Sequence, residues 1–184
     1  DIDSYFKWVN ALNRSFKFAE AVKVYDKILK VDPDNKAAQE RLKEAEKNLE
    51  RWTEIQRLTN EGRNDPSVHS IQGKLFFSIG DLEASRKAFE LAVSKEPQNT
   101  ELLERLSDVL ESSNLHEEAI PYLKRLVAIK QTDYEARLRL ARLCIVTMRF
   151  DEAVRHLKMV PANEDNSLGA AALLNTVSIL KPFP

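Results

Sequence analysis

The side chains that most often catalyse reactions or bind metals are few and isolated in this sequence. None of the three histidines, His69, His116 and His156, stands in a helical ligand arrangement with another histidine, a cysteine or a carboxylate. They are therefore interpreted as structural histidines. The single cysteine, Cys144, lies in the apolar run 140–146 and is predicted to be a buried, inert thiol. Because the sequence also has no glycine-rich phosphate loop and no G-x-S-x-G turn, we expect no enzymatic activity, no metal site and no cofactor.

One group of acidic residues has a regular spacing that favours binding. Its members follow one another at intervals of three, four and three residues, which places them on one face of a helix: Glu101, Glu104, Asp108 and Glu111. Such a stripe could attract basic or amide-bearing groups of a partner. A second interpretation stays open, in which the stripe is a solvated face whose charge is balanced by Arg105, Lys74 and Arg142.

The composition excludes several classes of protein. The 184 residues include 28 Lys+Arg and 29 Asp+Glu, so the net charge of -1 gives no general attraction to nucleic acid or to an anionic membrane surface. A hydrophobic content of 43% with 31% charged residues is typical of a soluble folded protein, and no uncharged apolar run is long enough for membrane insertion. The residues specify no compartment, although a cytoplasmic location is preferred.

A repeat of 34 residues organises the middle of the chain. Several independent positions in one phase are the sequence signature of a repeat protein. The small residues, the bulky residues and a turn position all keep this phase: Ser85, Ala119 and Ala153; Phe89, Leu123 and Leu157; Gly80 and Asn114.

Each repeat is predicted to be a pair of antiparallel helices. In the range 100–112 the apolar residues recur at helical spacing after Thr100, and a second amphipathic segment follows Asn114. The whole chain has only 4 Gly and 7 Pro, which is too few for a turn-rich all-β protein. Since one helix pair cannot bury its apolar face alone, successive pairs must stack. The sequence therefore predicts an all-α helical-repeat solenoid.

This pattern resembles the tetratricopeptide repeat, a helix–turn–helix unit of 34 residues. Segment 16–35, FKFAEAVKVYDKILKVDPDN, matches best, with Ala21, Tyr25 and Pro33 at characteristic positions of the family. The resemblance covers residues 2–35 and 66–165. The sequence departs from the family where a tryptophan is usual early in the first helix, at His69, Leu103 and Arg137.

The repeat and the resemblance divide the chain into four parts. These are an N-terminal helix hairpin in residues 1–35, a connecting helix in 36–65, three consecutive repeats in 66–165 and the helix of a truncated repeat in 166–184. The connecting helix is predicted to be continuous from 36 to 62, because neither glycine nor proline interrupts residues 36–61. The alternative is a tight hairpin near Leu49–Arg51.

In the tetratricopeptide repeat family, the first helix of each repeat lines a concave groove that holds a partner peptide. The resemblance therefore implies a partner-binding groove that contains Lys74, Phe77, Glu101, Glu104, Asp108, Glu111, Leu138 and Arg142. Some members bind the terminal carboxylate of a chaperone with a clamp of Lys, Asn and Arg. Here two lysines and two asparagines of that clamp are missing and Glu135 would repel the carboxylate, so we expect no such clamp.

The C-terminal helix is predicted to expose an apolar surface, because residues 167–180 contain no charged side chain. Its packing face is predicted to contain Leu168, Ala171, Leu174 and Leu180. Leu173 and Val177 would then lie on the far side, where an apolar patch usually marks a contact site. We expect either that further repeats follow in the natural protein or that this surface self-associates.

Together these features predict a non-enzymatic scaffold that binds a protein or peptide segment in its groove. The chain starts at Asp1 rather than Met and ends in an incomplete repeat, which predicts a fragment of a larger protein. The alternative function is an oligomerisation or packing module, whose ends rather than its groove make the contacts.

Overall fold

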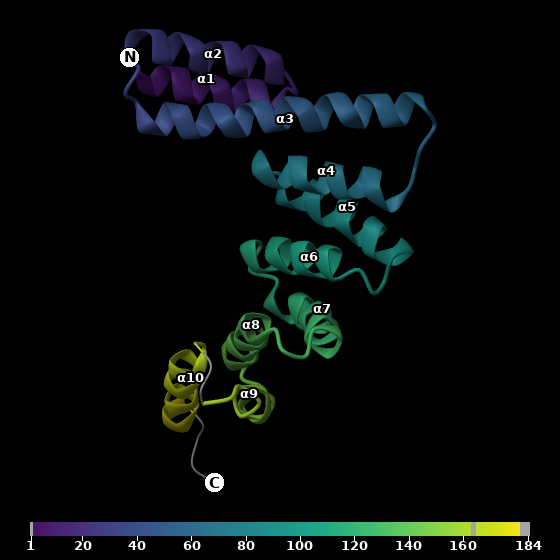
Figure 1. The fold of residues 1–184 in the computed structure, drawn as a ribbon, viewed down its shortest axis with the longest axis vertical. Coiled ribbons are helices and arrows are strands. Elements are labelled where there is room, and N and C mark those ends of the chain that lie inside the picture. The colour runs from purple at the N-terminus through teal and green to yellow at the C-terminus, as the bar shows by residue number, and fades with distance from the viewer. Residues whose placement is uncertain (1, 163–164, 181–184) are drawn as a thin grey trace. The chain divides into compact units, whose positions relative to one another are not determined.

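The computed structural model describes residues 2–162 and 165–180, and every regular element in these ranges is an α-helix (Figure 1). In chain order the helices are α1 (Ile2–Arg14), α2 (Phe18–Val31), α3 (Lys36–Asn60), α4 (Pro66–Ser78), α5 (Leu82–Lys95), α6 (Thr100–Ser112), α7 (His116–Ile129), α8 (Tyr134–Val146), α9 (Phe150–Leu157) and α10 (Ser167–Leu180). The predicted all-α fold is therefore confirmed. No helix in the described ranges is both long enough and apolar enough to cross a membrane.

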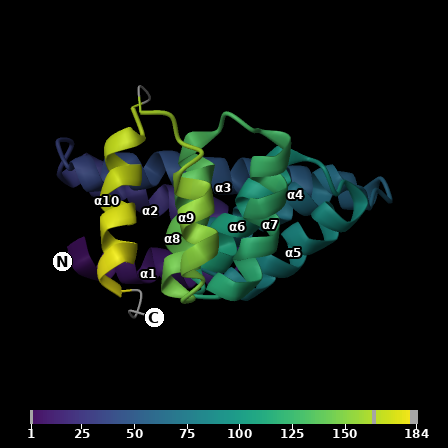
Figure 2. The same ribbon diagram turned by 90° about the horizontal axis from the view of Figure 1, so that it is seen from below.

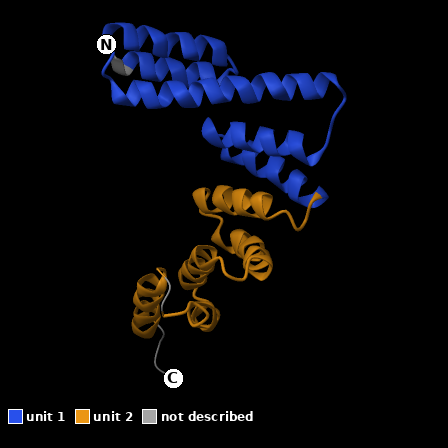
Figure 3. Cartoon of the chain, in the orientation of Figure 1, with its two compact units in different colours: residues 1–95 blue, residues 96–184 orange. Residues whose placement is uncertain are grey.

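The chain divides into two compact units, residues 1–95 with α1 to α5 and residues 96–184 with α6 to α10 (Figure 3). Within each unit, helices that follow one another in the sequence pack against each other. In the second unit α10 contacts both α9 and α8, and Figure 2 shows it lying beside α9. The boundary between the units falls inside the range 66–165 that the sequence predicts as three repeats.

The turn inside the helix pairs has the same structure at four places. The amide of the residue after the turn donates to a carbonyl five residues earlier, at 2.6 to 2.9 Å, which is the bond of a Schellman helix end. The predicted turn positions Gly80 and Asn114 are thereby confirmed, and the next position in phase is Met148. The residues with positive φ in these turns are Phe16 (56°), Gly80 (79°), Asn114 (58°) and Met148 (58°).

The connecting helix α3 is continuous over 25 residues, so the alternative of a hairpin near Leu49–Arg51 is wrong. Asn35 begins the helix, because its side chain accepts a hydrogen bond from the amide of Ala38 at 3.0 Å. The first half of α3 packs through Ala38 and Ala45 on the core of α1 and α2. Its second half packs through Ile55 against Leu75 of α4, so a single helix serves two neighbouring cores of the first unit.

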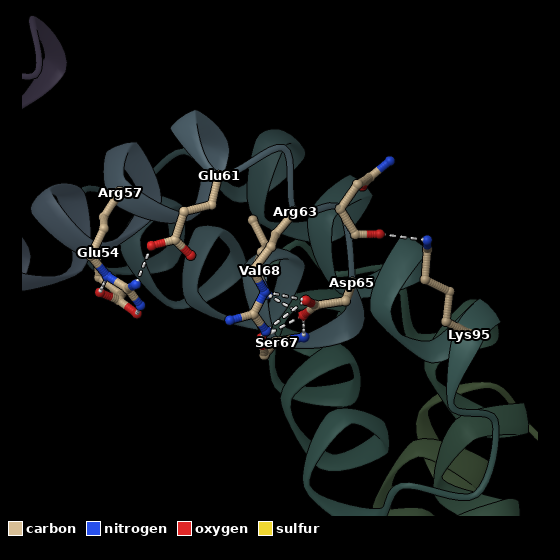
Figure 4. Close-up of polar contacts among 9 residues, drawn as sticks. Glu54, Arg57, Glu61, Arg63, Asp65, Ser67, Val68 and Lys95 are labelled. Atoms are coloured by element: carbon tan, nitrogen blue, oxygen red, sulfur yellow. Dashed lines mark hydrogen bonds and ion pairs between the residues drawn. The ribbon is translucent and has the colours of Figure 1, made fainter.

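The junction between α3 and α4 is held by side chains at its surface (Figure 4). Asp65 begins α4 by accepting hydrogen bonds from the amides of Ser67 and Val68. Hydrogen bonds from the Ser67 hydroxyl and from Arg63, which lies 2.6 Å away, lower the pKa of Asp65 to about 2. Lys95 at the end of α5 donates to the carbonyl oxygen of Asn64 at 2.8 Å. The loop is therefore tied to both helices that follow it.

Small residues lie where the helices of a pair cross, as the repeat predicts. Ser85, Ala119 and Ala153 have no exposed surface. In the first unit the hydroxyl of Ser85 donates to the carbonyl of Gly73 at 2.9 Å. A Cβ atom on Gly73 would lie 2.6 Å from the ring of Phe89, so the approach of α4 to α5 requires glycine at this position.

Candidate partner-binding surfaces

In the second unit, the acidic residues of the predicted stripe lie on one side of α6. Leu102, Leu103 and Leu106 are buried on the opposite side of the helix. Glu101 is exposed, whereas Glu104, Asp108 and Glu111 are half-buried. The side chain of Asn99 begins this helix by accepting from the amides of residues 101 and 102.

Two members of the stripe are bound by a single arginine of the next repeat. Nη2 of Arg139 on α8 lies 2.6 Å from Asp108 Oδ1 and 2.6 Å from Glu111 Oε1. Burial opposes the charge on this guanidinium, but the bonds to Glu111 and Asp108 outweigh burial and raise the pKa of Arg139. Arg105 adds a longer ion pair to Asp108, at 3.7 Å. The ion pairs thus connect α6 to α8 and neutralise part of the stripe.

Of the two groove residues expected on α8, one is exposed and one is buried. Arg142 is exposed and pairs with Glu135 on its own helix at 3.3 Å. Leu138 is only 2% exposed and belongs to a core cluster with Leu157 and Ala170, so its placement in an open groove is wrong. The reason is that α10 packs on α8, with Gly169 close to the Leu138 side chain.

In the first unit, Lys74 and Phe77 lie one helical turn apart on α4. Phe77 is 41% exposed although it is a large apolar side chain. Lys74 is half-buried. Both side chains are therefore accessible on one side of α4.

The packing face of α10 agrees with the predicted one at Leu174, which packs on the cluster of α8 and α9, but not at the exposed Ala171. Val177 is 3% exposed and Leu173 packs on the cluster of α8 and α9, so the prediction that both lie on the far side is wrong. Leu168 is instead 82% exposed, and Leu180 is 52% exposed. The small pair Gly169–Ala170 explains the difference, because its side of the helix can approach α8 most closely.

A polar cavity in the first unit was not anticipated from the sequence. It has a volume of about 220 Å³ between α1, α2, α3 and α4. Asn48 is 2% exposed there, and its Oδ1 lies 2.7 Å from Arg51 Nη1 and 2.6 Å from Ser78 Oγ. Oδ1 of Asn13, which also lines the cavity, has no hydrogen-bond partner among the described residues. The signal in the sequence is the position of Asn48, which lies about one helical turn after Ala45 on the packing side of α3.

The residues with catalytic potential remain apart. Burial, followed by the charge of Glu152, raises the pKa of Cys144 to about 11, so the prediction of a buried thiol is confirmed. His69 is also buried, with Nδ1 3.2 Å from the Gln72 side-chain oxygen. Within residues 2–162 and 165–180, no group of three or more metal-binding side chains gathers.

Paired helices whose turns at Gly80, Asn114 and Met148 are alike and 34 residues apart define a helical-repeat protein, and comparison with known families identifies which one. Two sequence profiles described as tetratricopeptide repeat match residues 72–134 and 112–175. Together the matches cover more than half of the chain. The protein belongs to the tetratricopeptide repeat family.

Curated relatives share part of this sequence. The chain is 31% identical over 127 residues to the peroxisomal targeting signal receptor of Saccharomyces cerevisiae, a match that covers 66% of the chain and 21% of the receptor. It is 31% identical over 98 residues to the receptor of the same name from Candida albicans, which covers 53% of the chain and 17% of that receptor. The chain thus spans about a fifth of the length of these relatives.

Solved structures share the fold at low sequence identity. YrrB, described as a TPR protein with an unusual peptide-binding site, is 19% identical with a TM-score of 0.58, and the match covers 98% of this chain and 78% of YrrB. The TPR2B domain of yeast Sti1, solved in a complex with pHsp70, is 16% identical with a TM-score of 0.52. That match covers 63% of this chain and 98% of the domain. At these identities the likeness shows the fold alone.

Proposed function

We propose that this protein is a non-enzymatic scaffold that binds a segment of a partner protein on the groove-facing side of its repeat helices. In the second unit this side is formed by α6 and α8. In the first unit it includes Lys74 and Phe77 on α4. Membership of the tetratricopeptide repeat family supports the general role, and the charges of the described residues support the chemistry of the partner segment.

The observation that carries this proposal is the charge of the α6–α8 face. The carboxylates on or beside this face outnumber its guanidinium groups by five to three. Arg139 and Arg105 balance the pair Asp108 and Glu111, and Arg142 pairs with Glu135. Glu104 is half-buried and has no ion-pair partner among the described residues. An acidic, partly desolvated side chain selects for a basic group on a partner. The face is made up of Glu101, Glu104, Asp108, Glu111 and Glu135 with Arg105, Arg139 and Arg142.

The first unit offers complementary chemistry for a polypeptide. The amide side chains of Asn10, which is exposed, and Asn13, which is half-buried, line its polar cavity. An amide group both donates and accepts hydrogen bonds, so it can bind the N–H and C=O groups of an extended peptide backbone. The relatives are consistent with binding of segments, since one is a receptor for a targeting signal and another is a domain in a complex with pHsp70.

The experiment uses the whole chain and a random peptide library displayed on phage. We expect the selected peptides to be enriched in Lys and Arg. Isothermal titration calorimetry then compares the parent with Glu104→Lys. Reversal of one charge in a partly desolvated contact should weaken binding by about tenfold, which corresponds to about 1.4 kcal/mol. The salt dependence of the affinity should fall at the same time.

Glu46→Lys is the matched control, because it makes the same charge change at an exposed position of α3. It should leave the affinity within about twofold of the parent. Asp108→Lys is less suitable as a first test, because it would also remove the ion pair with Arg139. Selected peptides without basic residues, whose affinity is the same for Glu104→Lys and the parent, would contradict the proposed acidic binding face.

A packing module is the second candidate function, and α10 is the observation that favours it. Leu168 and Ile179 are 82% and 74% exposed on a helix without a charged side chain. Surfaces of this kind usually contact another protein surface. In this alternative a second copy of the chain covers the exposed side of α10.

A further inference from the structure

A cavity of about 670 Å³ lies in the second unit between α7, the α7–α8 turn, α8 and α9. None of the residues of the α6–α8 partner-binding face lines it. Its volume falls within the range of pockets that hold small molecules. The side chains that line the cavity determine the chemical class of ligand that it would bind.

Arg137 is the unusual residue of this cavity, because it is a charged side chain that is only 4% exposed. Its Nη2 donates to the carbonyl oxygen of Gln131 at 2.8 Å, and its Nη1 lies 3.2 Å from the sulfur of Met159. Its Nε has no partner among the described residues. A guanidinium has five N–H donors, and a thioether is a weak acceptor, so most of this hydrogen-bonding capacity is unused.

The carboxylate nearest in the cavity lining does not neutralise Arg137. Glu152 is paired with Lys124 at 2.5 Å and lies 3.9 Å from Nε2 of His156. No ion pair or hydrogen bond joins Glu152 to Arg137 within the described part of the chain. A buried guanidinium without an anion is unfavourable, so the site is incomplete in electrostatic terms.

The other side chains that line the cavity can contact the parts of an organic ligand that do not bind Arg137. Nδ1 of His156 also lacks a partner, while burial, followed by the charge of Arg137, lowers the pKa of this imidazole. A neutral imidazole can donate or accept at that nitrogen. Val127 and Met159 provide apolar surface. Met159 is 57% exposed, so its flexible side chain can move away from Nη1 and open the guanidinium to a ligand.

We propose that this cavity binds a small organic anion, whose carboxylate or phosphate group pairs with Arg137 and whose apolar body lies against Val127 and Met159. Arg137 occupies a position where the repeat usually has an apolar aromatic residue, so the charge is not required by the packing of the fold. A guanidinium matches both oxyanions because two of its N–H groups can bind two oxygens at once.

The test compares charged and uncharged probes of the same shape on the whole chain. Benzoate and phenyl phosphate carry the two oxyanions, and benzamide has the shape of benzoate without its charge. The side-chain Nε–H signal of Arg137 is followed by NMR, with Arg137→Lys used to assign it. Benzoate should shift this signal saturably with a Kd on the order of 1 mM, as is usual for fragments of this size. Benzamide should not shift it. Comparison of the Kd of phenyl phosphate with that of benzoate shows whether the cavity prefers a phosphate or a carboxylate.

Arg137→Met removes the charge at similar volume, and Arg155→Gln is the control, because it removes one positive charge from an exposed position of α9. Benzoate affinity should fall at least tenfold in Arg137→Met and remain unchanged in Arg155→Gln. The proposal is overturned if benzamide shifts the Nε–H signal as benzoate does, or if Arg137→Met binds benzoate as the parent does. Should Arg137→Met fail to fold, the comparison of the two probes on the parent chain decides the matter.

Discussion

Single side chains hold the helix ends of this protein, and Asp65 at the start of α4 is one example. Its pKa is lowered from 3.8 to about 2 in the folded chain, chiefly by the hydrogen bond from Ser67 and by that from Arg63. A lowered pKa means that the ionised group stabilises the fold above pH 3.8, and that this contribution is lost as the pH falls towards 2. The start of α4 should therefore weaken in acid.

We expect Asp65→Asn to lower the Tm at pH 7 and to make the loss of stability between pH 4 and pH 2 less steep. The asparagine keeps an oxygen that can accept from the amides of α4 but loses the charge that pairs with Arg63. Circular dichroism melts across this pH range measure both effects. Asp26→Asn, at an exposed position of α2, is the control and should leave the Tm at pH 7 unchanged. Parallel acid profiles for Asp65→Asn and the parent would contradict this account.

The thiol of Cys144 should be unreactive in the native protein. With its pKa raised to about 11 by burial, about one thiol in a thousand is ionised at pH 8, and the thiolate is the reactive form. We expect mass spectrometry to find no alkylation by iodoacetamide at pH 8 under native conditions. The same reagent should modify the chain completely in concentrated urea. Alkylation of the native chain at the rate of the unfolded chain would show that Cys144 is accessible.

Pairs of helices depend on the small residues at their crossings. Ala119 has no exposed surface and lies on the buried side of α7. Ala119→Leu adds three carbon atoms to a close-packed crossing, which should lower the free energy of unfolding by about 1–3 kcal/mol. Ala37→Leu, at an exposed position of α3, makes the same change without overpacking. Urea denaturation measures both, and equal stabilities for the two variants would contradict the assigned crossing.

The helix α3 should be sensitive to proline at its centre. Leu49→Pro removes a backbone hydrogen bond and introduces a steric clash, which should lower the free energy of unfolding by about 3 kcal/mol or more. Leu49→Ala separates this effect from the loss of the side chain. Spin labels at positions 36 and 59 should also lie about 35 Å apart, at a rise of about 1.5 Å per residue. A distance near half of this value would indicate a bent or paired helix.

The sequence predicts local and periodic features of these elements better than contacts between elements. The 34-residue phase locates the turns at Gly80 and Asn114, because turn geometry depends on neighbouring residues. The absence of glycine and proline predicts the continuous α3. The ion pairs of Arg139 could not be predicted, because they depend on the distance between two helices that are far apart in sequence. The same holds for Leu138, which is buried only because α10 lies against it.

The orientation of α10 shows the limit of sequence periodicity at the scale of the whole molecule. An amphipathic helix reveals its buried side by the position of its charges, but residues 167–180 have none. Several rotations of the helix would therefore bury similar apolar area. The structure selects the side of Ala170, Leu173 and Val177, where small residues permit close approach. The opposite side, which includes Leu168 and Ile179, remains exposed.

The exposed side of α10 should make the whole chain self-associate at high concentration. Leu168 and Ile179 are eleven residues apart, which is about three turns, so they lie on the same side of the helix. Contact between two copies would remove both side chains from water, at about 25 cal/mol for each Å² of apolar surface buried. Sedimentation equilibrium should show an average mass that rises above the 21.1 kDa of one chain as the concentration increases.

Ile179→Glu should abolish this rise, because pairing of two copies would bring a charge into an apolar contact. Ser178→Glu is the matched control on the same helix, since Ser178 is exposed but lies about a quarter of a turn away from Leu168 and Ile179. It should associate as the parent does. If the parent keeps the mass of one chain at every concentration, α10 does not mediate self-association and the packing module is excluded for the chain alone. If Ser178→Glu is monomeric as well, the added charge rather than the Leu168 and Ile179 surface controls association.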